Sequence, residues 1–344
     1  MKKIILIIFV LSFFVVSCIP SGQQISEPSI EPPRQSDITE APPTIKEVDE
    51  HSSQPSLVKE QQQPQQTPTP TLSWKLGKVA IAGKYADADI VDLGNGEYRM
   101  YYSEEPEVPN FKGRVYSALS PDGINWQQEN GVRKEWAIFP SVIKLSDGRY
   151  RMYFQNEGVI KSAISNDGLL WKDEPGTRVD ASNNAGLKLN NVAAPTVMKI
   201  ADAYIMVYAG AINEKYPEKV PNNEIHLFLW ATSADGLSFE KKGIALDSRN
   251  NEFKGWIDGT EFIEWDDNSI RLYFWSYKGI YYVLYKGGNF SEDAVFDYTT
   301  NDNPLNQFPE NPPGDPTLAK INGQWFLFYG QHTKGIYYAV MKET

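Results

Sequence analysis

Carboxylate side chains gather in three segments that each lead into an apolar run of residues. These segments are Asp87-Ala-Asp89, Asp258-Gly-Thr-Glu261 and Asp315-Pro-Thr317. One protonated and one ionised carboxyl group that face each other across a pocket can act as general acid and general base, and hydrolysis of a glycosidic bond requires such a pair. The candidate catalytic residues are therefore Asp87, Asp258, Glu261 and Asp315. Asp89 is a candidate substrate-binding residue.

The carboxylate segments belong to a pattern that occurs five times, consisting of an apolar run, a tight polar turn and a strand rich in aromatic residues. The copies start at Asp89, Ser141, Thr196, Glu261 and Thr317. Gly, Asn and Asp in the turns allow the positive φ angles that hairpins need. Five units of about 50–65 residues predict an all-β fold, a five-bladed β-propeller with four strands per blade. Because the inner strands of a propeller converge on one funnel, the carboxylates would share one space.

A second repeat, Ser-x-Asp-Gly-x-x-aromatic, occurs at 120–126, 165–171 and 233–239. We interpret it as structural, placed at the end of the third strand in the first three blades and away from the axis. Asp-Gly would form the turn, the Ser and Asp side chains would bond to nearby backbone, and the aromatic ring would pack between sheets.

Trp136 and Trp256 lie just before the second and fourth inner strands. Aromatic faces at the mouth of a funnel can stack on sugar rings, so both are candidate substrate-binding residues. The chain has 1 Cys and 3 His, with no zinc-ligand spacing and no Gly-rich phosphate loop. We therefore expect a carbohydrate partner and no required cofactor.

The N-terminal residues 1–18 predict a signal peptide. Lys2 and Lys3 precede an apolar stretch that is too short for a membrane span. Its end, Val15-Val-Ser-Cys18, resembles a bacterial lipobox, which implies lipidation of Cys18. Residues 19–72 are rich in Pro, Gln and Ser and lack aromatic residues, so they predict a disordered linker. We expect an extracytoplasmic protein of the bacterial cell envelope that meets the membrane only through its lipid anchor.

The remaining residues, 73–344, are enough for one all-β domain, the propeller itself. The formal net charge of the chain is -11, which argues against nucleic acid and anionic surfaces as partners. We expect a monomer.

The segment Ala86-Asp-Ala-Asp-Ile-Val91, followed by Gly94–Tyr102, resembles the Asp-Pro-x-hydrophobic opening of five-bladed glycoside hydrolases. These are the enzymes of family 43 and their arabinanase, xylosidase and invertase-like relatives. The likeness in fold covers nearly all of 73–344, whereas the motif match is partial. The resemblance implies that Asp87 is the general base and that the glycosidic bond is hydrolysed with inversion. Asp258, where the family has the Glu of Glu-Gly-Pro, would be the general acid, with Glu261 as the alternative acid.

The chain also departs from the family pattern. Ala194 replaces the third carboxylate, which in the family tunes the pKa of the acid. Asp315 is an additional carboxylate in the fifth blade, and Asp315 or Asp89 is the candidate to compensate. The resemblance further implies a structural calcium ion on the axis, for which His332 is the candidate ligand.

Two other functions stay open from the sequence. The first is a non-catalytic, glycan-binding propeller lipoprotein, which Ala194 and the absence of a clear Glu in the fourth blade support. The second is a sialidase-like enzyme, suggested by the Asp-Gly repeat. A sialidase needs three inward arginines, whereas we expect the strand arginines to face outward. These are Arg99, Arg149, Arg151 and Arg271.

Overall fold

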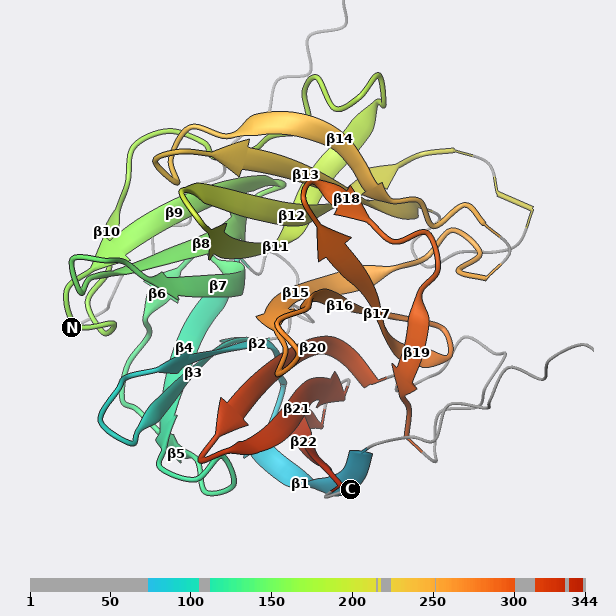
Figure 1. The fold of residues 1–344 in the computed structure, drawn as a ribbon. Helices are drawn as coiled ribbons and strands as arrows, with labels where there is room; N and C mark the ends of the chain where they lie inside the picture. Colours follow the sequence, from blue (N-terminus) through green and yellow to red (C-terminus); the bar gives the residue numbers. More distant parts are fainter. Residues whose placement is uncertain are drawn as a thin grey trace, which may run out of the picture. The chain divides into compact units, whose positions relative to one another are not determined.

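The computed structural model describes residues 74–104, 112–214, 216–217, 224–250, 252–300, 313–331 and 334–342, all within the compact unit Gln66–Thr344. The strands of this unit form five sheets around a common centre (Figure 1). The predicted all-β, five-bladed propeller is confirmed. No helix in the described part of the chain is long and apolar enough to span a membrane. The predicted signal peptide, Cys18 and the predicted linker lie outside the described residues.

Each of the first three blades is an antiparallel sheet whose four strands follow one another in chain order from the centre outward. Blade I contains β2 (Tyr85–Asp92), β3 (Tyr98–Glu104), β4 (Arg114–Ser120) and β5 (Gln127–Gln128), and β6 (Lys134–Glu135) also pairs with β4. Blade II contains β7 (Ile138–Lys144), β8 (Tyr150–Asn156), β9 (Val159–Ser165) and β10 (Lys172–Asp173). Blade III contains β11 (Leu189–Ile200), β12 (Ala203–Ile212), β13 (Ile225–Ser233) and β14 (Glu240–Leu246).

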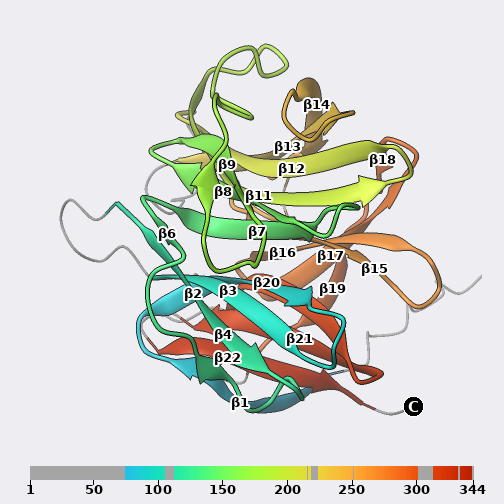
Figure 2. The ribbon, with the colours of Figure 1, turned by 90° about the vertical axis from the view of Figure 1, so that its left-hand side faces the viewer.

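The last two blades depart slightly from this plan. Blade IV contains β15 (Asp258–Glu264), β16 (Ile270–Ser276), β17 (Gly279–Lys286) and β18 (Asn289–Phe290), and β19 (Val295–Tyr298) also pairs with β17. Blade V contains β20 (Pro313–Ile321), β21 (Gln324–Gln331), β22 (Gly335–Met341) and β1 (Trp74–Ala82). The outer strand of blade V therefore comes from the start of the domain, and β1 lies beside β22 near the C-terminus (Figure 2).

The five inner strands β2, β7, β11, β15 and β20 contact one another in cyclic order, and β20 returns to β2. One buried apolar cluster fills each interface between neighbouring blades. For example, Phe228 of blade III packs edge-on against Phe274 of blade IV, with ring centroids 5.5 Å apart. The core is thus divided among five interfaces, and burial of large aromatic side chains holds the ring of blades together.

The Asp-Gly repeat forms a turn after the third strand of blades I to III, where the sequence placed it. In the first copy, Asp122 Oδ1 accepts hydrogen bonds from the backbone N–H groups of Ile124 and Asn125, both at 2.8 Å. Ser120 Oγ accepts one from Gly123 N at 2.9 Å. These hydrogen bonds favour the ionised carboxylate and hold the pKa of Asp122 at about 2. The carboxylate of Asp122 therefore serves to stabilise the turn.

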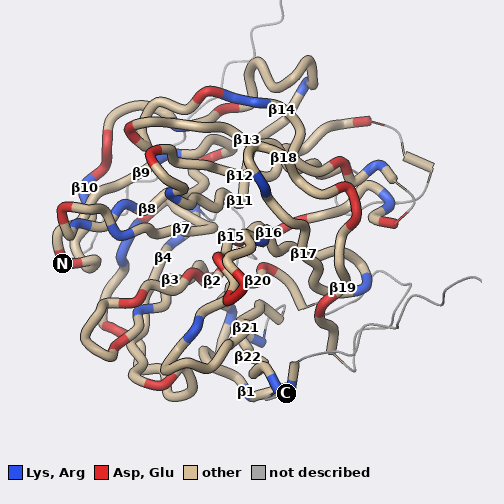
Figure 3. The backbone as a smooth tube through the Cα atoms, viewed as in Figure 1, with Lys and Arg blue, Asp and Glu red and all other residues tan. Residues whose placement is uncertain are grey.

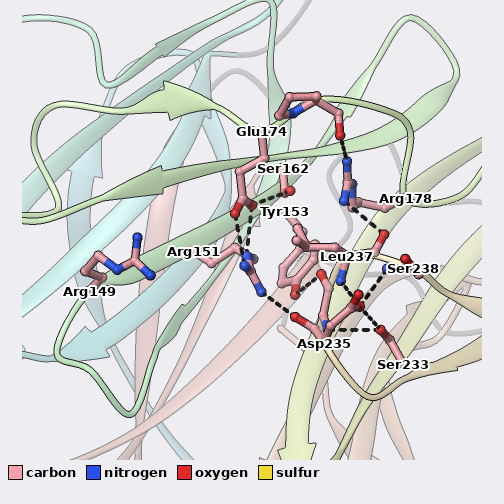
Figure 4. A network of polar contacts seen from close by, with 12 residues as sticks. Arg149, Arg151, Tyr153, Ser162, Glu174, Arg178, Ser233, Asp235, Leu237 and Ser238 are labelled. Atoms are coloured by element: carbon pink, nitrogen blue, oxygen red, sulfur yellow. Dashed lines mark hydrogen bonds and ion pairs between the residues drawn. The ribbon is translucent and has the colours of Figure 1, made fainter.

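The turns of blades II and III are also bonded by the preceding blade. Arg151 of blade II donates a hydrogen bond to the carbonyl of Asp235 at 3.1 Å, and Tyr153 donates one to the carbonyl of Gly236 at 2.8 Å (Figure 4). Arg99 and Tyr101 of blade I bond in the same way to Asp167 and Gly168. A Cβ atom added to Gly236 would lie 2.6 Å from Nη1 of Arg151, so glycine is needed for this close approach.

The strand arginines therefore differ from the sequence expectation. Arg99 and Arg151 are buried between blades instead of facing outward, because their guanidinium groups bridge a glutamate of their own blade and the turn of the next. Arg271 of blade IV stacks over Trp265, 4.2 Å from the ring centroid. Arg149 is exposed and pairs with Asp147 at 2.8 Å.

We predict that Arg151→Met lowers the free energy of unfolding by about 3–5 kcal/mol, because the substitution leaves Glu174 without the partner of a largely buried ion pair. The measurement is urea denaturation of the full chain. Arg149→Met is the matched control, and its exposed pair should contribute less than about 1 kcal/mol. Equal effects of the two substitutions would contradict the role of Arg151 between the blades.

Candidate functional site at the centre of the propeller

Every inner strand carries an irregularity at the same place. The pairing register with the second strand shifts by one residue between Ala86 and Asp89 in blade I, and equivalent shifts occur in the other four blades. Each shift is a β-bulge, a device that redirects a side chain. The bulged residues all have positive φ angles, and they are Asp87 (54°), Phe139 (51°), Ala194 (43°), Gly259 (59°) and Asp315 (46°).

The bulges together line one central pocket. Asp87, Glu261 and Asp315 contribute carboxylate side chains, and Phe139, Ala194 and Pro316 are among the apolar residues of the lining. Figure 3 shows acidic residues of β15 and β20 near the middle of the ring of blades. The space inside this pocket is about 20 Å³, enough for one water molecule. Three of the four candidate catalytic residues therefore lie at one pocket.

Asp258, the fourth candidate catalytic residue, does not line the central pocket. The bulged position of blade IV is Gly259, so Asp258 precedes the place that Asp87 occupies in blade I. Its carboxylate lies 3.5 Å from Nδ1 of His226 and accepts a hydrogen bond from Gly259 N at 2.9 Å. The expected placement of Asp258 at the site is therefore corrected, because the bulge puts Gly259, one residue later, at the pocket.

Asp315 occupies the space that a side chain at position 259 would need. A Cβ atom added to Gly259 would lie 2.5 Å from Oδ1 of Asp315 and 2.7 Å from its Cα atom. Trp275 Nε1 donates a hydrogen bond to the same Oδ1 atom at 3.1 Å. The carboxylate of Asp315 in blade V is therefore held over Gly259, the bulged residue of blade IV, which has no side chain of its own.

A ring of polar side chains lies two residues beyond the bulges. Its members are Asp89, Ser141, Thr196, Glu261 and Thr317. Several accept a hydrogen bond from the backbone of the next blade, as Asp89 Oδ2 does from Val142 N at 2.8 Å. Thr317 Oγ1 donates one to Glu261 Oε1 at 3.2 Å. The sequence reading overlooked this ring as a unit, although a polar residue recurs at the same register in all five repeats.

Asp89 is a member of this ring and not a part of the pocket lining, which corrects its expected contact with substrate. Burial raises the pKa of Asp89 to about 7. Burial, followed by repulsion from Asp89, raises the pKa of Glu261 well above its usual range. Burial and mutual repulsion thus both oppose the ionisation of these two carboxyl groups, so they do not ionise together in the usual pH range of Asp and Glu.

The two candidate tryptophans lie elsewhere. Trp256 is 5% exposed, and its ring stacks on His226 with centroids 4.2 Å apart. It therefore belongs to the core between blades IV and V, and its expected role in sugar stacking is corrected. Trp136 is 48% exposed but lines a separate hollow on blade II.

His332, the candidate calcium ligand, lies outside the described residues. Within the described ranges, no group of three His, Cys, Asp or Glu side chains could hold a metal ion. No arginine is among the residues that line the central pocket, so the described lining lacks the arginine cluster of a sialidase.

The comparison with solved structures agrees with the fold. A member of the GH130 family, whose mannoside phosphorylases include hydrolases that target β-1,2 mannosidic linkages in Candida mannan, matches with a TM-score of 0.57 and 14% identity, covering 79% of this chain and 95% of its own. A GH43 β-xylosidase/α-arabinofuranosidase from a compost microbial metagenome matches with a TM-score of 0.55 and 17% identity, covering 79% and 96%. No family model and no curated sequence matches the chain. The structural neighbours are thus five-bladed glycoside hydrolases, and at these identities they establish the shared fold.

We predict that Gly259→Ala destabilises the protein by more than about 3 kcal/mol, because it adds overlap with Asp315 to the strain of a positive φ angle. Gly323→Ala is the matched control, since Gly323 has a φ of 83° and nothing within 4 Å of an added Cβ atom. Its cost should be the strain alone, about 1–3 kcal/mol.

The double variant Gly259→Ala/Asp315→Ala separates the two contributions to this cost. Thermal and urea unfolding should show that removing the Asp315 carboxylate recovers part of the stability. Equal costs for Gly259→Ala and Gly323→Ala would rule out the predicted overlap.

Proposed function

We propose that this protein is a glycoside hydrolase that acts on a poly- or oligosaccharide through carboxylate acid/base chemistry. The observation that carries this proposal is a pocket lined by three carboxyl groups, one of which has a raised pKa. Glu261 has a raised pKa and lines the pocket beside Asp87 and Asp315. A glycosidase requires one carboxyl group that is protonated and one that is ionised.

In this mechanism Asp87 is the general base and Glu261 the general acid. Asp87 takes a proton from a water molecule, and the resulting hydroxide attacks the anomeric carbon. Glu261 gives its proton to the leaving oxygen as the glycosidic bond breaks. The product then carries the inverted anomeric configuration. The pocket has space for the attacking water, and the carboxyl group of Asp315 lies at the same pocket.

The fold supports a carbohydrate as substrate by analogy. The structural neighbours include proteins described as hydrolases of mannosidic linkages and as a β-xylosidase/α-arabinofuranosidase. We place the activity on plant or microbial polysaccharide. We also propose that Cys18 is lipidated and that residues 19–72 hold the catalytic domain away from the membrane of a bacterial envelope, as a monomer without nucleic-acid partners.

A non-catalytic glycan-binding propeller is the second candidate. The bulges of blades III and IV carry Ala194 and Gly259, so neither contributes a carboxylate to the pocket. A propeller that retains the funnel but lacks these groups could hold a sugar without cleaving it.

The experiment measures hydrolysis of aryl glycosides and polysaccharides by the full chain, and glycan binding in parallel. Asp87→Asn and Glu261→Gln should each lower kcat by about 10²–10⁴-fold, whereas Asp258→Asn should retain most of the activity because its carboxylate is not at the pocket. Glycan binding without hydrolysis by the wild type would support the second candidate. Loss of activity in Asp258→Asn, with Glu261→Gln active, would overturn the assignment of the acid.

A further inference from the structure

A second hollow lies on blade II, apart from the central pocket, and has a volume of about 510 Å³. It is formed between β6, β8, β9 and the segment after β10. The lining residues that matter here are Lys134, Trp136, Phe154, Asn156, Lys161 and Thr177. The lining thus combines aromatic rings with ammonium, amide and hydroxyl groups, the mixture found in sites for small polar ligands.

Trp136 is held in this hollow by its backbone. The residue is 48% exposed. Its backbone has a φ of 62°, a conformation that residues other than glycine rarely adopt. Its N–H donates a hydrogen bond to the carbonyl of Gly113 at 2.8 Å, and its own carbonyl accepts one from Nδ2 of Asn156 at 2.7 Å. The surroundings therefore maintain a strained backbone, and such strain clusters at ligand sites. The indole ring is about half exposed, with Nζ of Lys112 5.2 Å from its centroid on one side.

The two carboxylates that line the hollow have ion-pair partners, whereas one of its lysines does not. Asp173 pairs with Lys134 at 3.2 Å, and Glu174 pairs with Arg151 at 2.8 Å. No carboxylate of the described residues lies within ion-pair distance of Lys161. Both carboxylates of the lining are thus paired. Lys161 lies near the Lys112–Glu157 ion pair but has no ion pair of its own among the described residues, so its ammonium group can meet a negative charge.

We propose that this hollow binds an acidic sugar of a glycan, with its ring on the indole of Trp136 and its carboxylate paired with Lys161. The C–H face of a pyranose ring suits the aromatic face, and Asn156 and Thr177 offer hydrogen-bonding partners for hydroxyl groups. The chain as a whole carries a net charge of -11, which repels anions, so this binding depends on the local positive charge.

The hollow on blade II and the central pocket are lined by residues that are close in sequence. Trp136 and Phe139, which line the hollow and the central pocket respectively, are three residues apart, so their Cα atoms are separated by no more than about 11 Å. The binding site goes beyond the proposed hydrolysis and does not depend on it.

The test is the affinity of the full chain for tetragalacturonate, measured by calorimetry and tryptophan fluorescence in the Asp87→Asn background so that hydrolysis cannot consume the ligand. Trp136→Ala should weaken binding about tenfold or more, and Trp136→Tyr should restore most of the affinity. Lys161→Gln should weaken binding several-fold and reduce its salt dependence. Lys199→Gln is the control, because Lys199 lies over Tyr204, outside the hollow, and should leave the affinity unchanged.

Three results would overturn the proposal: no binding of tetragalacturonate, an affinity that does not change in Trp136→Ala, or equal affinity for neutral xylotetraose. Because binding is the readout, these results are distinguishable from an absence of hydrolysis. Thermal unfolding of each variant shows whether the domain remains folded, and exposed Trp136 should be replaceable without loss of stability.

Discussion

The β-bulge in each inner strand is the constraint on which the rest of this structure depends. It turns one residue per blade into the central pocket, and it places a polar side chain two residues later against the next blade. Where that side chain accepts the backbone N–H of its neighbour, as Ser141 does from Val197 and Thr196 from Phe262, the same local distortion forms the pocket and joins the blades. The carboxylates of Asp89 and Glu261 are buried because they belong to this ring.

The outer parts of the blades are joined by different means. In blades I to III backbone hydrogen bonds to the Asp-Gly turns favour the ionised carboxylate. An arginine and a tyrosine of the preceding blade bond to the turn carbonyls in blades II and III. Acidic residues therefore serve two opposite purposes in one molecule. In exposed turns hydrogen bonds favour the charge, and in the central ring burial opposes it.

Local patterns in the sequence were sufficient to predict the strands, the hairpin turns and the number of blades, since each depends on neighbouring residues. The position of the bulge was not predictable, because a shift of one residue exchanges the inward and outward side chains. For this reason Asp258 was expected in a place that Gly259 occupies. Long-range partners were likewise hidden: nothing near Trp256 reveals that His226 covers its ring, and nothing in Trp74–Ala82 reveals that it completes the last blade.

The most direct measurement for this account is the titration of the buried carboxyl pair by ¹³C NMR of protein labelled at the Asp and Glu carboxyl carbons. The account predicts that the Glu261 signal keeps the chemical shift of a protonated carboxyl group above about pH 5, where ordinary Asp and Glu side chains have ionised, and that this signal disappears in Glu261→Gln. The full set of carboxyl groups ionising below about pH 5 would contradict the account, because Glu261 would then have no proton to donate at neutral pH.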